Sequence, residues 1–169
     1  MSRPGPILFL DLARTLGWAL GAPGGAPTSG AITLSPGAAD TPPIFAHLER
    51  WVLATVQEAR PALIVYEAPP YLPSHSVKTM EMLFGYAAIA QAAAWNGGCR
   101  NVRSARVHDI RKYLLGANAP RKAGDAKKAV QAHLIAQNHI FGNDPDRADA
   151  VAGWLYATGV LYPAARDAR

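Results

Sequence analysis

The chain has 169 residues, of which 50% are hydrophobic and 17% charged, a composition that excludes a disordered chain and predicts one globular domain spanning residues 1–169. The formal net charge of +5 at pH 7 favours an anionic partner, with nucleic acid ahead of a membrane surface. The single cysteine excludes an internal disulfide, and no apolar run is long enough for a signal peptide or a membrane span, so we expect a soluble cytoplasmic protein.

The first third of the chain predicts three strands. The apolar run 7–10 follows a Pro-Gly-Pro turn and stops at Asp11, as a buried strand would. Residues 17–20 and 30–34 give two further strands, separated by a stretch rich in glycine and proline. Three strands with turn signals between them suggest an antiparallel meander.

A helix and a fourth strand follow. Thr41 is expected to cap the helix, whose apolar residues keep helical spacing until Pro61. The apolar run 62–66 then stops at Glu67. A helix between two buried strands is a crossover, which predicts that the strands ending at Asp11 and Glu67 are parallel.

The rest of the chain alternates helices with one more strand. We expect a helix over 76–95, a strand over 101–105, and helices over 107–115, 125–140 and 146–161. The fold class is therefore α/β, with a mixed five-stranded sheet of three antiparallel strands and then parallel strands, flanked by helices. This order resembles the RNase H-like fold, which many nucleases share with actin-like ATPases.

Four carboxylates stand out by position. Asp11 and Glu67 end two strands at the edge where α/β sheets build their sites, and Asp146 and Asp149 share one face of the last helix. Converging carboxylates repel one another unless a cation lies among them, and ligands that are all oxygen suit Mg²⁺ or Mn²⁺. Two such ions can activate a water and stabilise the leaving oxygen of a phosphodiester. We interpret the set as a site for two Mg²⁺ ions, with Mn²⁺ as a substitute.

Each acid also has an ordinary structural explanation. Asp11 and Glu67 could be loop residues, Asp146 could be the N-cap of its helix, and Asp149 could be a first-turn acid favoured by the helix dipole. The four acids taken together favour metal ligation.

A basic segment runs from Arg100 to Lys128, with nine lysines and arginines against two acids. Such an excess favours contact with phosphates over a merely solvated face. In the loop after Glu67, Tyr71 is placed to stack on a base. The candidate nucleic-acid contacts are Arg14, Tyr71, Arg103, Arg106, Arg121, Lys122, Lys127 and Lys128.

Four segments in order resemble the motifs of the RuvC-type Holliday-junction resolvases. The first is residues 7–11 with Gly17-Trp18-Ala19, and the second is Val65-Tyr66-Glu67. Residues 127–131 resemble the family's basic helix, and residues 146–152 resemble its carboxyl-terminal pair of metal ligands.

The resemblance implies a homodimer that cuts two strands of a four-way DNA junction symmetrically. Asp11, Glu67, Asp146 and Asp149 would be metal ligands, and Lys127, or alternatively Lys128, would serve the phosphate. A branch-migration motor is a further candidate partner. The chain departs from the family pattern at Ala13, where a glycine is usual, and at Tyr71, which is displaced by one residue from the usual aromatic wedge.

Three other functions fit parts of the sequence. Asp11 and Thr15 give some support to an actin-like nucleotide-binding module, although the turn between them lacks the glycines that would approach a phosphate. A non-catalytic module that holds branched DNA is a second alternative. A nuclease acting on RNA or on hybrids is the third, since metal chemistry reads the phosphate and not the base.

Overall fold

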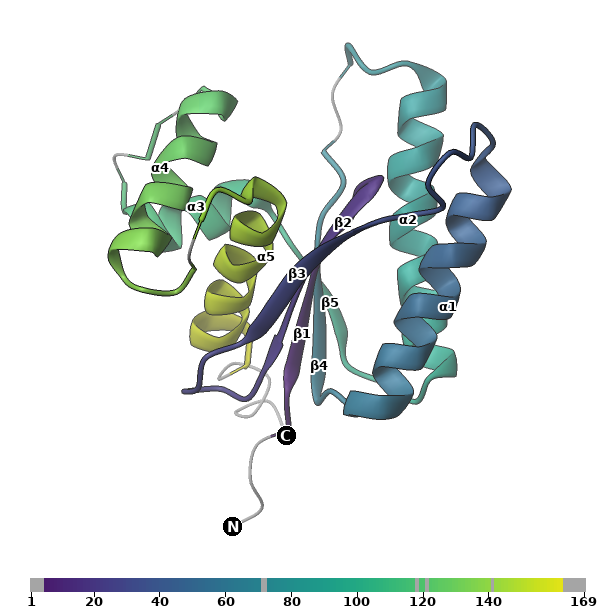
Figure 1. Ribbon diagram of the computed structural model, residues 1–169, viewed down its shortest axis with the longest axis horizontal. Coiled ribbons are helices and arrows are strands. Elements are labelled where there is room, and N and C mark those ends of the chain that lie inside the picture. The colour runs from purple at the N-terminus through teal and green to yellow at the C-terminus, as the bar shows by residue number, and fades with distance from the viewer. Residues whose placement is uncertain (1–4, 71–72, 118, 121, 141, 163–169) are drawn as a thin grey trace.

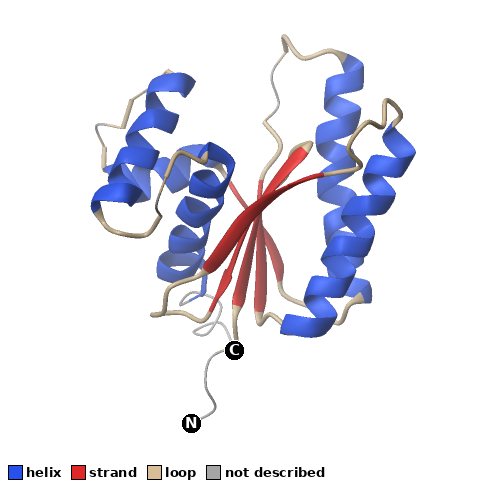
Figure 2. Ribbon diagram, viewed as in Figure 1, coloured by secondary structure: helices blue, strands red, loops and turns tan. Residues whose placement is uncertain are grey.

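The computed structural model describes residues 5–70, 73–117, 119–120, 122–140 and 142–162. Five strands and five α-helices make up the described part of the chain, with one π-helical segment (Figure 2). In chain order they are β1 (Ile7–Asp11), β2 (Thr15–Gly21), β3 (Thr28–Thr33), α1 (Thr41–Ala59), β4 (Leu63–Glu67), α2 (Val77–Asn96), β5 (Val102–Ala105), α3 (Val107–Leu115), α4 (Ala123–Ala136), α5 (Pro145–Tyr156) and the π-helical segment Ala157–Leu161.

The strands form one mixed sheet in the order β3-β2-β1-β4-β5. Neighbours are antiparallel from β1 to β3, and β4 is parallel to both β1 and β5. This topology confirms the predicted α/β fold class, including the parallel pairing of β1 with β4. Leu10 pairs with Tyr66, and Glu67 pairs with Ala105, so the carboxyl ends of β1, β4 and β5 lie level at one edge of the sheet.

Helices cover both faces of the sheet (Figure 1). On one face, α1 and α2 enclose a core that includes Leu8, Leu10 and Ile64. On the other face, α5 lies against the sheet with α3 and α4 outside it, over a core that includes Phe9 and Val65. Alternate residues of a strand face opposite layers, and each buried strand therefore supplies both cores.

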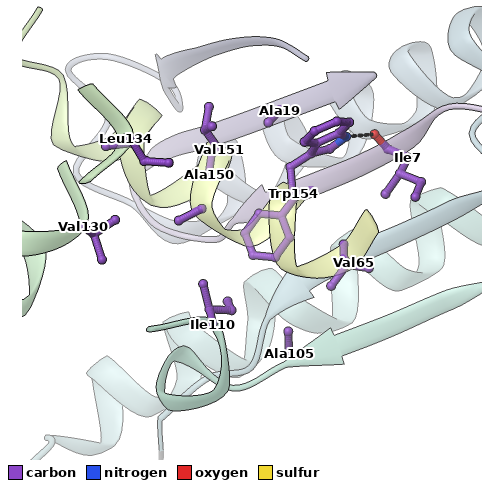
Figure 3. Close-up of a cluster of buried hydrophobic side chains, with 14 of the residues drawn as sticks. Ile7, Ala19, Val65, Ala105, Ile110, Val130, Leu134, Ala150, Val151 and Trp154 are labelled. Atoms are coloured by element: carbon purple, nitrogen blue, oxygen red, sulfur yellow. Dashed lines mark hydrogen bonds between the residues drawn. The ribbon is translucent and has the colours of Figure 1, made fainter. Parts of the chain in front are cut away.

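The indole of Trp154 anchors α5 to the sheet (Figure 3). Its Nε1–H donates a hydrogen bond of 3.1 Å to the carbonyl oxygen of Ile7. Gly153 permits the close approach, because a Cβ at that position would overlap the ring of Phe9. The helix is thus held at a fixed height over β1.

Several predicted boundaries differ from the structure. Strand β3 begins at Thr28 and not at residue 30, because its ladder with β2 runs from Leu20 paired with Thr28 to Thr15 paired with Thr33. The N-cap position of α1 is held by Asp40, although its side chain makes no capping hydrogen bond. Helix α4 spans Ala123–Ala136 and not 125–140. No helix in the described ranges is both long enough and apolar enough to cross a membrane.

Candidate active site at the carboxyl edge of the sheet

Strand alternation directs Asp11 and Glu67 to the same layer. Asp11 lies two residues after Phe9 on β1, and Glu67 lies two residues after Val65 on β4. Phe9 and Val65 belong to the core beneath α5. Both carboxyl groups therefore face α5, from neighbouring positions on two parallel strands, and both residues are half-buried.

The first turn of α5 lies directly against the end of β1. Gly17 of β2 pairs with Asp11, and a Cβ at Gly17 would lie 3.3 Å from the Cβ of Asp11. The same Cβ would overlap the backbone carbonyl oxygen of Asp146. A glycine at this position thus allows the backbone of Asp146 to pack beside Asp11.

The N-cap of α5 is Asp144, and not Asp146. The Asp144 carboxylate accepts a hydrogen bond of 3.0 Å from the backbone N–H of Arg147. The side chain of Arg147 donates from Nε to the hydroxyl of Ser29 on β3, at 2.8 Å. Because the capping role is filled by Asp144, the structural explanation considered for Asp146 does not hold.

Burial and mutual repulsion perturb the two strand-end acids. Burial, followed by the charges of Glu67, Asp149 and Asp146, raises the pKa of Asp11 to about 7, against an opposing effect of Lys127. Burial and the charge of Asp149 raise the pKa of Glu67 to about 7, with Arg111 and Lys127 opposing. Asp11 is therefore within electrostatic range of the other three predicted acids, which come from β4 and α5.

Lys127 of α4 is paired to this acidic group. Its Nζ lies 2.9 Å from Oδ2 of Asp149. Burial lowers the pKa of Lys127, but the hydrogen bond and charge of Asp149 and the charges of Asp11 and Asp146 outweigh it, and the pKa is raised. The neighbouring Lys128 makes no ion pair with a carboxylate of the described ranges. Of the two lysines weighed from the sequence, the structure brings Lys127 to the acids.

Arg111 of α3 is a second basic residue at the site, and no motif in the sequence distinguishes it from the other basic residues of its segment. It is half-buried, and its charge lowers the pKa of Glu67. Its only sequence signal was its place in the basic segment. Lys127 and Arg111 thus act on the acidic group from two different helices, α4 and α3.

The other predicted nucleic-acid contacts are more scattered. Arg14 donates from Nη2 to the carbonyl oxygens of Ser35 and Ala38, at 3.0 and 2.7 Å, so it binds the loop before α1. The remaining described candidates lie along β5 and the starts of α3 and α4; they are the half-buried Arg103 and the exposed Arg106 and Lys122. Tyr71 and Arg121 lie outside the described residues.

The donor chemistry of the acidic group suits a hard divalent cation, since all four side chains offer carboxylate oxygens in a half-buried setting. As the side chains are positioned, no three acidic, histidine or cysteine residues of the described ranges lie close enough to hold one ion together. The packing at Gly17 fixes the backbone of Asp146 beside Asp11. The distances between the carboxylate oxygens depend in addition on rotation about the side-chain bonds.

Comparison with solved structures identifies the fold. RuvC from Thermus thermophilus aligns with a TM-score of 0.68 at 16% identity, covering 95% of this chain and 96% of that one. The same protein in complex with a Holliday-junction substrate gives 0.70 at 16%, covering 94% of each chain. The yeast mitochondrial Holliday-junction resolvase Ydc2 gives 0.58 at 14%, covering 99% of this chain and 86% of that one. No protein-family model and no curated protein matches the chain. The chain therefore has the RuvC-type resolvase fold.

Proposed function

We propose that this protein is a divalent-metal-dependent endonuclease that resolves four-way or other branched DNA junctions by hydrolysis of phosphodiesters. The observation that carries the proposal is the acidic group at the carboxyl edge of β1 and β4. Two half-buried carboxyls there have a pKa of about 7, and a lysine from a separate helix is paired to the group. Keeping like charges together in this way is unfavourable for stability, which favours a functional role.

Asp11, Glu67, Asp146 and Asp149 would hold the metal ions, two Mg²⁺ or alternatively Mn²⁺. Bound there, divalent cations would supply a nucleophilic water at neutral pH and stabilise the leaving oxygen of the phosphodiester. Lys127, with its Nζ 2.9 Å from Asp149, would contact the phosphate at the cleavage point. The protein itself then needs no covalent nucleophile.

The fold supports DNA as the substrate, because one structural neighbour is solved with a Holliday junction. Along the basic segment, Arg103, Arg106, Lys122 and Lys128 would contact the DNA backbone. We further propose that residues 1–169 act as one nuclease domain in the cytoplasm, with a branch-migration motor as a candidate partner.

A homodimer is supported by an apolar face of α2. Val77, Phe84 and Trp95 are exposed by 76%, 50% and 57%, and their spacings of seven and eleven residues place them on one side of the helix. Large apolar side chains exposed on one side of a helix favour packing against a partner, and Val77 and Phe84 are the more available of the three, because the Arg100 guanidinium lies 4.1 Å from the centre of the Trp95 ring. In sedimentation analysis, the wild type should be a dimer and Phe84→Glu should be a monomer. A wild-type protein that remains a monomer when junction DNA is present would contradict the dimer.

The direct test is cleavage of a labelled synthetic four-way junction beside a linear duplex of the same sequence. We expect paired nicks near the junction centre with Mg²⁺ or Mn²⁺ and none with EDTA. If flaps, forks and hybrids are cut as readily as the junction, the protein is a nuclease but not a junction-specific resolvase. Binding without cutting would favour the non-catalytic module, and stabilisation by ATP without DNA binding would favour the actin-like module.

A further inference from the structure

A basic pocket lies along α3, the helix that carries Arg111. It has a volume of about 410 Å³, and its lining residues are four residues of α3 together with Gly116, Ala117, Ala119 and Pro120. His108, Arg111 and Lys112 all line it, and among the described residues no acidic side chain does. None of the three basic residues has a carboxylate partner within ion-pair distance in the described ranges.

The pocket is adjacent to the proposed active site because of how α3 begins. Ala105, the last residue of β5, pairs with Glu67, and α3 starts two residues later at Val107. Arg111 is one helical turn further along, where its charge still acts on Glu67. Arg111 therefore lines the pocket and also acts electrostatically on Glu67 of the acidic group.

The composition of the pocket selects an anion. A second pocket of about 420 Å³ lies at the opposite edge of the sheet, near Arg60 and Cys99, and Arg60 is the one charged residue among the described residues that line it. The α3 pocket instead gathers an arginine, a lysine and a histidine within five residues of one helix. Cations that lack a protein partner and lie beside a carboxylate group are suited to hold a phosphate at some distance from those carboxylates.

We propose that this pocket binds a backbone phosphate of the DNA next to the phosphate that is cleaved. The inference rests on the proposed function and adds a subsite to it. Arg111 lies between the two positions, while His108 and Lys112 hold the flanking phosphate. The subsite positions the strand and takes no part in the chemical step.

The test is binding of a labelled four-way junction, measured by fluorescence anisotropy in Ca²⁺ or EDTA over a range of salt concentrations. One phosphate contact contributes about 0.9 to the slope of log affinity against log salt, which corresponds to roughly eightfold at 0.1 M salt. Lys112→Gln should lower the salt-dependence slope by about 0.9 and weaken junction binding roughly eightfold at 0.1 M salt. Lys112→Arg keeps the charge and should restore the wild-type slope. Arg50→Gln removes the same charge from an exposed position on α1, on the other face of the sheet, and should match the wild type.

A second variant tests the space in the pocket independently of the pocket's charge. Ala117 lines the pocket and is exposed, so Ala117→Trp should fill the space without unfolding the protein, which thermal melting checks. It should weaken junction binding severalfold with no change in net charge. Normal binding by Lys112→Gln or by Ala117→Trp, beside a wild type that binds and cuts, would overturn the subsite alone. A wild type that binds no DNA would overturn the subsite and the proposed function together.

Discussion

Replacing Asp11 with asparagine should stabilise the protein while abolishing its activity. Burial and three neighbouring carboxylates raise the pKa of Asp11 from 3.8 to about 7. Each tenfold change in proton affinity corresponds to about 1.4 kcal/mol, so the charged form destabilises the fold by at most about 4 kcal/mol at pH 8. Asp11 is only half-buried and keeps some hydration, and we therefore expect about 2 kcal/mol for Asp11→Asn.

The pH dependence has a definite sign. A carboxyl whose pKa is raised by folding favours the folded state in its protonated form, so its contribution to stability is lost as pH rises from about 4 to about 7. The gain from Asp11→Asn should therefore be small at pH 4 and complete at pH 8. In a domain of this size about 2 kcal/mol corresponds to a rise in Tm of roughly 4 to 8 °C.

The assay is thermal unfolding in EDTA at pH 4 and pH 8. Glu49→Gln is the matched control, because Glu49 is an exposed acid on α1 and should shift the unfolding free energy by less than about 0.5 kcal/mol. Added Mg²⁺ should stabilise the wild type more than Asp11→Asn. A variant that is no more stable than the wild type at pH 8 would refute the view that these carboxylates are held together at a cost.

Three other predictions follow from individual contacts. Lys127→Gln should reduce junction cleavage by more than tenfold in a single-turnover assay, and Lys128→Gln should change the cleavage step little, because Lys127 is the lysine paired to Asp149; equal effects would contradict that assignment. Gly153→Ala should destabilise the fold by about 2 kcal/mol or more in urea unfolding, since its Cβ would overlap the ring of Phe9; a neutral result would mean that α5 shifts easily on the sheet. Asp144→Ala should lower the unfolding free energy by about 1 kcal/mol through the lost cap of α5, and no loss would contradict the capping role.

Much of the site could be predicted from the sequence because the local residue pattern of a buried strand shows where the strand ends and which side chains share a face. The apolar run that stops at Asp11 and the run that stops at Glu67 each mark the end of a buried strand, and a crossover helix between them requires parallel neighbours. The period of two residues then directs both acids to the layer of α5. These inferences use only local pattern and chain connectivity.

What the sequence did not reveal depends on contacts between distant segments. The start of β3 at Thr28 is set by its ladder with β2, and the capping role of Asp144 is seen only in its hydrogen bond to Arg147. In the sequence, Arg111 is one of nine basic residues in its segment and nothing distinguishes it. Only the position of α3 in the fold shows that its charge acts on Glu67. Helix α4 ends before its predicted boundary because the backbone turns at Asn138, where φ is 58°.

The most direct test of the central claim measures junction cleavage and junction binding together for the acid-to-amide variants Asp11→Asn, Glu67→Gln and Asp149→Asn, with Glu49→Gln as the control. If the carboxylates form a metal site for phosphodiester hydrolysis, each of the three variants should lose cleavage in Mg²⁺ and bind the junction as tightly as the wild type or more tightly, because each removes negative charge near phosphate. Cleavage at the wild-type rate by these variants would contradict the account.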